Sequence, residues 1–384
     1  MNDYKKYWIW LSMTLGAAAK TDEVLTAFPR PHKLYESQEK ERILAGVFTK
    51  GQSERLRATQ LDTATDILAK CEKNGWQVVT PDDAVYPAGL KKISDMPLVL
   101  YVDGDISCLR GKVIIGVVGT RKPNYESIAI ARNISGDLVK AGAVVVSGGA
   151  LGIDSAAHEA AMENNGKTVC VLGCGLGTRY LMDNAAMRRE ISRTGAVVTE
   201  YAPFAEVTRM SFPQRNRIIS GMSHGLLVVE AGSRSGSLIT ARCAAEQGRE
   251  VFAIPGSVLS SAYTGANNLI RDGAKAVTCA RDILTPFSAI YPDRINLNAT
   301  GVETVCVKSV NSERKKPSVP EKKAATELKG DAAAIYGLFG GEALHPDEIC
   351  AMTGLPLSKV ISALMKLEME DYIEQTEGKN YIIK

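Results

Sequence analysis

Seven short apolar runs that follow one another from Val113 onward restrict this chain to few folds. They read VIIGVVG, AVVVSGG, TVCVLG, AVVTE, GLLVVEA, VFAIPG and AVTC, and they alternate with segments of helical periodicity. Strands that are apolar at nearly every position are covered on both faces, which is typical of a parallel sheet with crossover helices. The pattern predicts an α/β domain with a doubly wound parallel sheet over residues 111–287.

The first 80 residues predict a helical N-terminal domain, with helical runs near 6–19, 22–28, 36–49 and 60–73. Residues 81–110 carry too many prolines and turn residues for a long element and are expected to be a connector. Two lysines before the apolar run YWIWLSMTLGAAA also fit a secretory signal, but Trp8, Leu11 and Leu15 share one helical face. That shared face favours an amphipathic core helix, and we expect no membrane segment.

A charged, proline-bearing stretch follows the sheet. Residues 288–330 lose the strand and helix periodicity and contain NSERKKPSVPEKKAATELKG, which predicts a linker. Residues 331–384 show three helical patterns and then two short extended runs around a Glu-Gly-Lys turn. Three helices and a hairpin predict a C-terminal winged-helix module.

Amino-acid composition constrains the fold and function less than the hydrophobic pattern does. The chain has 384 residues and a formal net charge of +3, so a nucleic-acid partner would be bound by a local basic patch. The eight cysteines are scattered without CxxC spacing, so we expect no metal site and a cytoplasmic protein with free thiols.

The loops after the predicted strands indicate where a ligand would bind, because open parallel sheets bind ligands beyond the carboxyl ends of their strands. These loops read GTRKPNYES, SGGALGIDSAAH, GCGLGTRY, AGSRSGS and PGS. Glycine lets backbone amides approach a ligand, hydroxyls donate hydrogen bonds, and each following helix begins with unpaired N–H groups. The pattern predicts a phosphate-sized anion site formed by Ser147, Gly148 and Gly149 with Ser235, Gly236 and Ser237. Tight turns with capping serines are the alternative for any single loop.

Two further motifs have competing interpretations. Arg215, Asn216 and Arg217 lie at a predicted helix start in FPQRNRIIS, where two arginines favour phosphate contact as much as solvated charge. Asp154 and His158 lie four residues apart on one helix face. They fit either an acid/base or metal-binding pair or, more often, a helix-start carboxylate near a structural histidine. A dinucleotide site is disfavoured because Thr178 stands where GxGxxG needs its third glycine.

At these motifs the chain resembles the bacterial DNA processing protein A family (DprA, also called Smf). The matching segments run in the family's order from about residue 75 to 285, and they include VVGTRKP, FPQRNRIISG and the long VVEAGSRSGSLITARCAAEQGREVFAIPG. The resemblance implies a helical N-terminal domain, related to SAM or helix-hairpin-helix modules, an extended Rossmann-like domain and a winged helix. It also implies a cytosolic homodimer without enzymatic activity or cofactor. The expected function is to bind and protect single-stranded DNA and to load a RecA-type recombinase during natural transformation.

The resemblance also implies roles for single residues. By position, Gly119 and Arg121 of VVGTR belong to the DNA site, with Arg121 as a backbone-phosphate contact, and Arg209 stands where members often have a basic residue. Two departures weaken parts of this assignment. The family's motif usually continues Tyr-Pro, whereas here Tyr180 is followed by leucine and methionine. The N-terminal helices also lack the glycine-rich hairpin of a helix-hairpin-helix.

Dimer formation is expected through the last segment of the sheet domain. Leu269 and Ile270 are neighbours on a short predicted helix, so they point about 100° apart and only one of them can face the sheet fully. Ala276 begins the last strand, whose free edge invites pairing, although some members carry a larger apolar residue there.

Two other function classes fit parts of the sequence. A nucleoside-monophosphate phosphoribohydrolase would use a similar sheet and glycine loops, but its PGGxGTxxE motif carries a catalytic glutamate that EAGSRSGSLIT lacks. A transcription regulator acting through the winged helix is disfavoured because Lys359 and Lys366 on the last helix are opposed by Glu368, Glu370 and Asp371.

Overall fold

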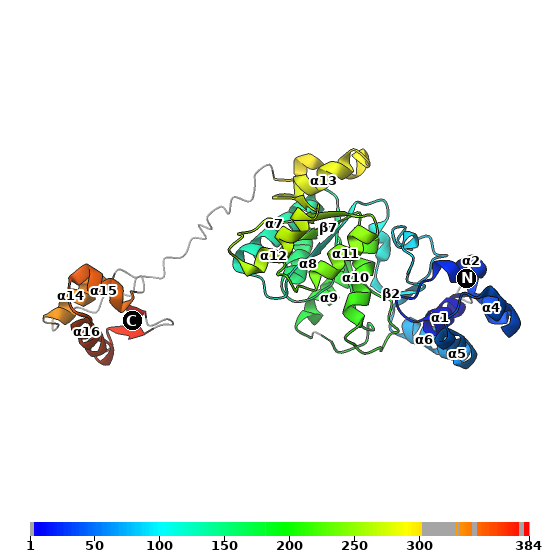
Figure 1. Ribbon diagram of the computed structural model, residues 1–384, viewed down its shortest axis with the longest axis horizontal. Coiled ribbons are helices and arrows are strands. Elements are labelled where there is room, and N and C mark those ends of the chain that lie inside the picture. Colours follow the sequence, from blue (N-terminus) through cyan, green and yellow to red (C-terminus); the bar gives the residue numbers. More distant parts are fainter. Residues whose placement is uncertain are drawn as a thin grey trace. The chain divides into compact units, whose positions relative to one another are not determined.

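The computed structural model describes residues 4–180, 182–301, 328, 330–339, 344–375 and 380–383. The chain divides into two compact units, residues 1–305 and 306–384 (Figure 1). Most of the predicted linker, residues 302–327 and 329, lies outside the described residues, as does the predicted Glu-Gly-Lys turn.

A nine-stranded sheet organises the first unit. The strand order is β1-β2-β6-β5-β4-β3-β7-β8-β9, in which β3 to β9 pair in parallel and β1 and β2 are antiparallel additions. The seven parallel strands are β3 (Ile114–Val118), β4 (Val144–Ser147), β5 (Thr168–Val171), β6 (Ala196–Thr199), β7 (Gly225–Val228), β8 (Glu250–Ala253) and β9 (Lys275–Ala276). The first six coincide with predicted apolar runs, whereas β9 overlaps the run AVTC only at Ala276. Every residue of β3 to β7 is buried, as strands covered on both faces must be.

The connector and part of the N-terminal segment are also strands of this sheet. Strand β1 (Gln77–Val79) and strand β2 (Leu100–Gly104) extend it beyond β6, so residues 81–110, expected to be a connector without a long element, contribute one short strand to the sheet. Tyr101 of β2 is opposite Thr199 of β6. Proline and turn residues around β2 hid a strand of only five residues, although the buried run Leu98 to Val102 is apolar throughout.

Crossover helices cover both faces of the sheet. One face packs against α7 (Tyr125–Lys140), α8 (Ile153–Glu163) and α13 (Ala280–Ser288), and the other against α10 (Ser211–Met222), α11 (Ser237–Glu246) and α12 (Thr264–Arg271). Helix α9 (Ala185–Thr194) lies beside α8. Neighbouring strand residues belong to opposite cores: Ile114 packs on the side of α10, α11 and α12, and Ile115 on the side of α7, α8 and α13. The sheet is therefore doubly wound, as the sequence predicted.

Six short helices form the N-terminal domain, and they pack at the β1–β2 edge of the sheet (Figure 1). They are α1 (Lys5–Leu15), α2 (Asp22–Ala27), α3 (Pro31–Glu36), α4 (Glu39–Ala45), α5 (Lys50–Ala58) and α6 (Leu61–Lys73). The single helix expected over 36–49 is wrong, because Gly46 adopts a left-handed φ of 63° that ends α4. Trp8, Leu11 and Leu15 are buried, as the amphipathic core helix required.

Residues 288–301, expected as the start of the linker, pack on the sheet domain. Ile295 is buried, and the backbone N–H of Asn296 donates to the Ala141 carbonyl at 3.0 Å. Arg281 donates to the Leu297 carbonyl at 3.0 Å. Short 3-10 turns have no strand or helix periodicity, so the sequence pattern could not show this part of the domain.

The second unit has the three helices and hairpin of a winged helix. The helices are α14 (Asp331–Leu338), α15 (Pro346–Thr353) and α16 (Leu357–Met369), and β10 (Ile373–Gln375) pairs antiparallel with β11 (Tyr381–Ile383). In the described part of the chain no single helix is long and apolar enough to cross a bilayer; α15 and α16 reach that length only as a pair bent by 115°.

Candidate functional site

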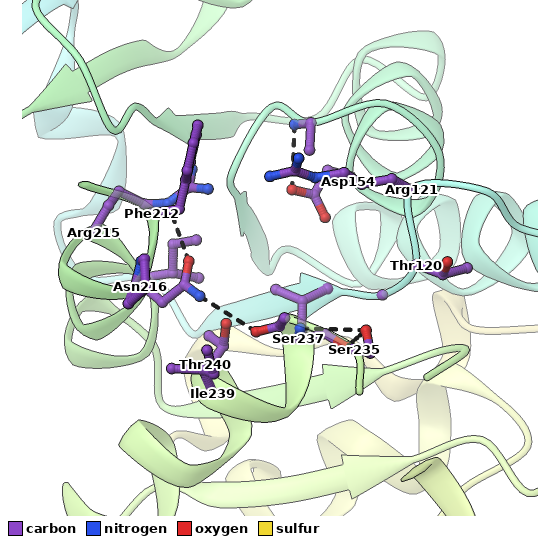
Figure 2. A pocket seen from close by; sticks show the side chains of 16 residues that line it. Thr120, Arg121, Asp154, Phe212, Arg215, Asn216, Ser235, Ser237, Ile239 and Thr240 are labelled. Atoms are coloured by element: carbon purple, nitrogen blue, oxygen red, sulfur yellow. Dashed lines mark hydrogen bonds between the residues drawn. The ribbon is translucent and has the colours of Figure 1, made fainter. Parts of the chain in front are cut away.

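A pocket of about 430 Å³ opens at the carboxyl end of the sheet, where the strand order reverses beside β3. Four segments line it: the loop after β3, the β4–α8 loop with the start of α8, the first half of α10, and the loop after β7 with the start of α11. Figure 2 shows Arg121 and Asp154 facing side chains from α10 and from the start of α11. Ligands of doubly wound sheets bind at this switch point, so the loops and the strand order indicate the same location.

The first contact pair of the pocket is a cation and an aromatic ring. Arg121 is exposed, and the centre of its guanidinium lies 5.2 Å from the centre of the Phe212 ring. Phe212 lies in the first turn of α10, and both residues line the pocket. Sequence reasoning placed Arg121 in the site but missed Phe212, although FPQRN puts an aromatic residue at the helix start. The pocket therefore offers a charge and a stacking surface together.

Arg215 forms the floor of the pocket rather than a free contact. It is 5% exposed, and its guanidinium donates to the carbonyl oxygens of Gly148, at 2.7 Å, and Val171. Burial lowers the pKa of Arg215, and the Asp154 carboxylate opposes that shift. The side chain keeps a positive charge close behind the pocket wall while its donors hold the β4–α8 loop in place.

Asp154 is tied to the same loop. Its Oδ2 accepts from the backbone N–H of Gly148 at 3.2 Å and of Ala150 at 3.3 Å. Burial raises its pKa, and Arg215 and these donors oppose the rise. Of the described residues that line the pocket, Asp154 alone carries a carboxylate, and its hydrogen bonds stabilise the loop.

The β4–α8 loop is only partly in the site that the sequence predicted. Ser147 is fully buried and its hydroxyl donates to the Val117 carbonyl at 2.6 Å, so it joins two strands and does not reach the pocket. Gly148 and Gly149 line an adjoining recess with Tyr180 and Arg188. Gly149 has a φ of 64°, and a Cβ there would run into the Cys170 sulfur.

The serine loop lies where the sequence placed it. The hydroxyls of Ser235 and Ser237 are 2.8 Å apart, and Ser237 is the first residue of α11. Asn216 Nδ2 donates to the Gly236 carbonyl at 3.5 Å, which joins α10 to this loop. A Cβ built on Gly236 meets nothing within 4 Å, so this glycine is not required by the protein's own packing. A Cβ on Gly119, by contrast, would lie only 2.6 Å from Cγ1 of Ile153, so the packing requires a glycine at this position.

The predicted phosphate role of Arg217 is wrong. Its guanidinium is buried and forms ion pairs with Glu200 at 2.5 Å and Asp95 at 3.2 Å. Residues 215 and 217 are about 200° apart on α10, so they point to different sides of the helix. Arg209 is exposed in the loop before α10 and does not line the pocket. Arg234, directly before Ser235, is also exposed and also lies outside the pocket lining.

The Asp154–His158 pair is structural. His158 is fully buried, with its Nδ1 2.7 Å from the Thr168 hydroxyl. Burial is the main cause that lowers its pKa, to about 3. Within the described ranges no group of three His, Cys, Asp or Glu residues could hold a metal ion.

The residues expected at a dimer interface lie near the β9 edge of the sheet. Leu269 and Ile270 are both half-buried and pack against one core cluster, so neither is as exposed as the adjacent-residue argument predicted. Ala276 is exposed on β9, the last strand in the sheet order. Their role in dimer formation stays a prediction.

Comparison with known proteins adds to this geometry. The family model described as DNA recombination-mediator protein A matches residues 77–288, more than half of the chain. The chain belongs to this family. A second model, the DprA winged helix domain, matches residues 319–379. The first match begins at β1, where the observed sheet also begins.

Several DprA and Smf proteins are similar over long stretches. DNA processing protein DprA of Streptococcus pneumoniae is 42% identical over 209 residues, which cover 53% of this chain and 72% of that protein. Protein Smf of Escherichia coli is 32% identical over 332 residues, 85% of this chain and 83% of that protein.

Solved DprA structures show the same fold. The X-ray structure of the Streptococcus pneumoniae protein superimposes with a TM-score of 0.64 at 33% identity, covering 73% of this chain and 97% of that one. DNA processing protein A of Helicobacter pylori, studied for its single-stranded DNA binding mode, gives a TM-score of 0.51 at 29% identity over 56% of this chain and 97% of that one.

Proposed function

We propose that this DprA family member binds single-stranded DNA without base preference through the switch-point pocket. The observation that carries the proposal is the Arg121 guanidinium over the Phe212 ring, beside the amides and hydroxyls of Ser235 to Ser237. A nucleotide unit has an anionic phosphate and a flat base, and the pocket offers a cation and N–H donors for the first and a ring for the second.

The absence of base preference follows from which groups face the pocket. Backbone amides, hydroxyls and arginine address the phosphodiester, and an aromatic ring stacks on any base. Arg215 and Asp154 are engaged by the protein's own backbone, so they set the charge and shape of the floor and do not read base edges.

The wider role is proposed from family membership. In this proposal the protein is a cytosolic homodimer. It binds and protects incoming single-stranded DNA and loads a RecA-type recombinase on it during natural transformation. The family description as a recombination mediator and the single-stranded DNA binding of the Helicobacter pylori relative support this role. It requires no enzymatic step and no cofactor.

The rival phosphoribohydrolase function finds less support in the pocket. Glycosidic cleavage needs a carboxylate free to act on the sugar, whereas Asp154 is held by two backbone N–H groups at the buried floor. Incubation with nucleoside monophosphates tests it directly, since release of free base would favour the enzyme.

Titration of the protein with fluorescent single- and double-stranded oligonucleotides of equal length tests the proposed function. We expect tighter binding of the single strand, similar affinities for different sequences, and a steep loss of affinity with salt. A preference for duplex, or binding that Phe212→Ala and Arg121→Ala together leave unchanged, would contradict it. Assembly of the recombinase on strands coated with single-strand-binding protein, with and without this chain, tests the mediator role.

A further inference from the structure

Helix α16 has a second apolar face that the described residues leave open. Its first face, with Val360, Leu364 and Leu367, is buried in the core of the second unit. The open face consists of Leu357, Ile361, Met365 and Met369, which are 48%, 42%, 59% and 88% exposed. We call these four residues the α16 ridge. They lie four apart, so they form one row about 18 Å long at 1.5 Å per residue.

Met352, on the neighbouring helix α15, is a further exposed apolar side chain at 63%. Large contiguous apolar surfaces are rare on monomeric soluble proteins and mark interaction sites. Three of the five exposed side chains, on α15 and α16, are methionines, whose flexible and polarizable side chains adapt to different partners. The surface therefore has the chemistry of a protein-docking site.

The winged-helix module around the ridge is acidic. Residues 331–384 contain nine Asp and Glu against four Lys, a formal charge of −5 in a chain whose net charge is +3. Glu368 is exposed between Met365 and Met369, and Glu370 and Asp371 are exposed directly after the helix. Lys366 lies 3.9 Å from Glu370, so part of its charge is compensated.

The acidic charge of the module distinguishes three kinds of partner: duplex DNA, a second copy of the module and a basic protein. A helix that reads duplex DNA needs Lys and Arg to neutralise phosphates, and the α16 ridge has apolar side chains at that place and acidic ones beside it. A second copy of the module would bring another charge of −5 to the contact. A basic partner with its own apolar stripe would satisfy both the ridge and the acidic flank.

We propose that the α16 ridge is the docking site for an amphipathic helix of a partner protein, whose apolar stripe is flanked by Lys or Arg. A row of side chains four apart packs into the groove between the rows of another helix, at about −50°. The proposal concerns a different surface from the switch-point pocket and does not depend on the pocket's DNA function.

Methionine methyl NMR on the full chain tests this docking. The probe is a synthetic amphipathic helical peptide of leucine and lysine, and the control is the same peptide with glutamate for lysine. We expect the leucine-lysine peptide to shift the methyl signals of Met352, Met365 and Met369, and the glutamate peptide to leave them unchanged. Shifts confined to other methionines, or equal binding of both peptides, would overturn the proposal.

Point variants of neighbouring residues sharpen the test. Ile361→Ser removes a ridge side chain, and we expect peptide affinity to fall about tenfold or more. Ser362→Ala, the next residue on the exposed side of α16, is the matched control and should stay within about twofold of the wild type. Equal effects of the two variants would overturn the assignment of the ridge.

Two other occupants are distinguished in the same spectra. Titration with a short DNA duplex should not move the three methyl signals, and shifts at an affinity equal to that of the peptide would overturn the proposal in favour of DNA reading. Dilution of the chain without peptide should also leave them unchanged. Shifts that follow protein concentration would assign the ridge to a second copy.

Discussion

The guanidinium of Arg121 lies 5.2 Å from the centre of the Phe212 ring, although one residue follows strand β3 and the other begins helix α10. The two are brought together because α10 packs on the face of the sheet over β3 and begins beside the loop that follows β3. Each residue has a separate task in the proposed DNA site: the cation neutralises a phosphate, and the ring stacks on a base. The contributions of the cation and of the ring to DNA binding can be measured in separate variants.

Replacing the ring should cost affinity without changing the electrostatics. We expect Phe212→Leu to weaken single-strand binding by about 1 to 3 kcal/mol, the contribution of one base–aromatic stack, and to leave the salt dependence unchanged. Fluorescence anisotropy at several salt concentrations measures both quantities. Phe204, which is 54% exposed but does not line the pocket, supplies the control Phe204→Leu. Equal losses in the two variants would contradict base stacking at Phe212.

Arg217 should matter for folding and not for DNA binding. Arg217→Ala leaves the buried Glu200 without its partner, and breaking a buried ion pair in this way costs about 3 to 5 kcal/mol of unfolding free energy. We expect a large drop in denaturant midpoint, with the affinity of the folded fraction unchanged. The double variant Arg217→Met with Glu200→Gln, which removes both charges, should recover part of the stability. A folded Arg217→Ala protein that loses DNA affinity would contradict this prediction and show that Arg217 contributes to DNA binding.

His158 should make stability depend on pH. Its pKa is lowered to about 3 in the folded protein, against about 6.5 in an unfolded chain, so only the unfolded state binds its proton between these values. Stability should therefore be complete above about pH 6.5 and fall by up to about 1.4 kcal/mol per pH unit below it. Urea unfolding of the wild type and His158→Asn at pH 7 and pH 5 measures the difference. An equal loss in both proteins would exclude His158 as the cause.

Dimer formation through the last segment of the sheet is the fourth prediction. We expect Ile270→Glu to give a folded monomer with weaker single-strand binding, because a two-fold dimer offers one strand two pockets. Ile270 is half-buried, so Ala276→Asp at the exposed edge strand is the second variant and should act in the same direction. Sedimentation velocity gives the mass of each. Dimers of unchanged stability in both variants would exclude this interface.

The parts of the fold that have a regular pattern could be predicted from the sequence. Strands β3 to β7 have continuous apolar runs, because both faces of each are covered, and α16 has the apolar spacing of a core helix. Strands β1 and β2 lie among turn residues, and residues 288–301 use 3-10 turns, so neither has a period to detect. Glu200 and Asp95 come from distant parts of the chain, and their contact with Arg217 could not be read from the sequence.

The candidate site, too, could be predicted only in part from the sequence. The serine loop and Arg121 lie where strand-end glycines and hydroxyls placed them. Ser147 has the same residue type and loop position, yet it faces the Val117 carbonyl, since the direction of a side chain at a strand end depends on the pleat. Phe212 was missed because a single aromatic residue at a helix start carries no pattern that separates a binding surface from a core contact.

The salt dependence of single-strand binding in Arg121→Ala is the most direct test of the account, because it counts phosphate contacts. The logarithm of the binding constant falls linearly with the logarithm of salt concentration, and each neutralised phosphate contributes about 0.7 to that slope for a single strand. We predict that the variant binds all sequences more weakly and loses about that much slope, while Arg209→Ala, outside the pocket, changes it less. A slope equal to that of the wild type would place Arg121 outside the DNA site and contradict the proposed pocket.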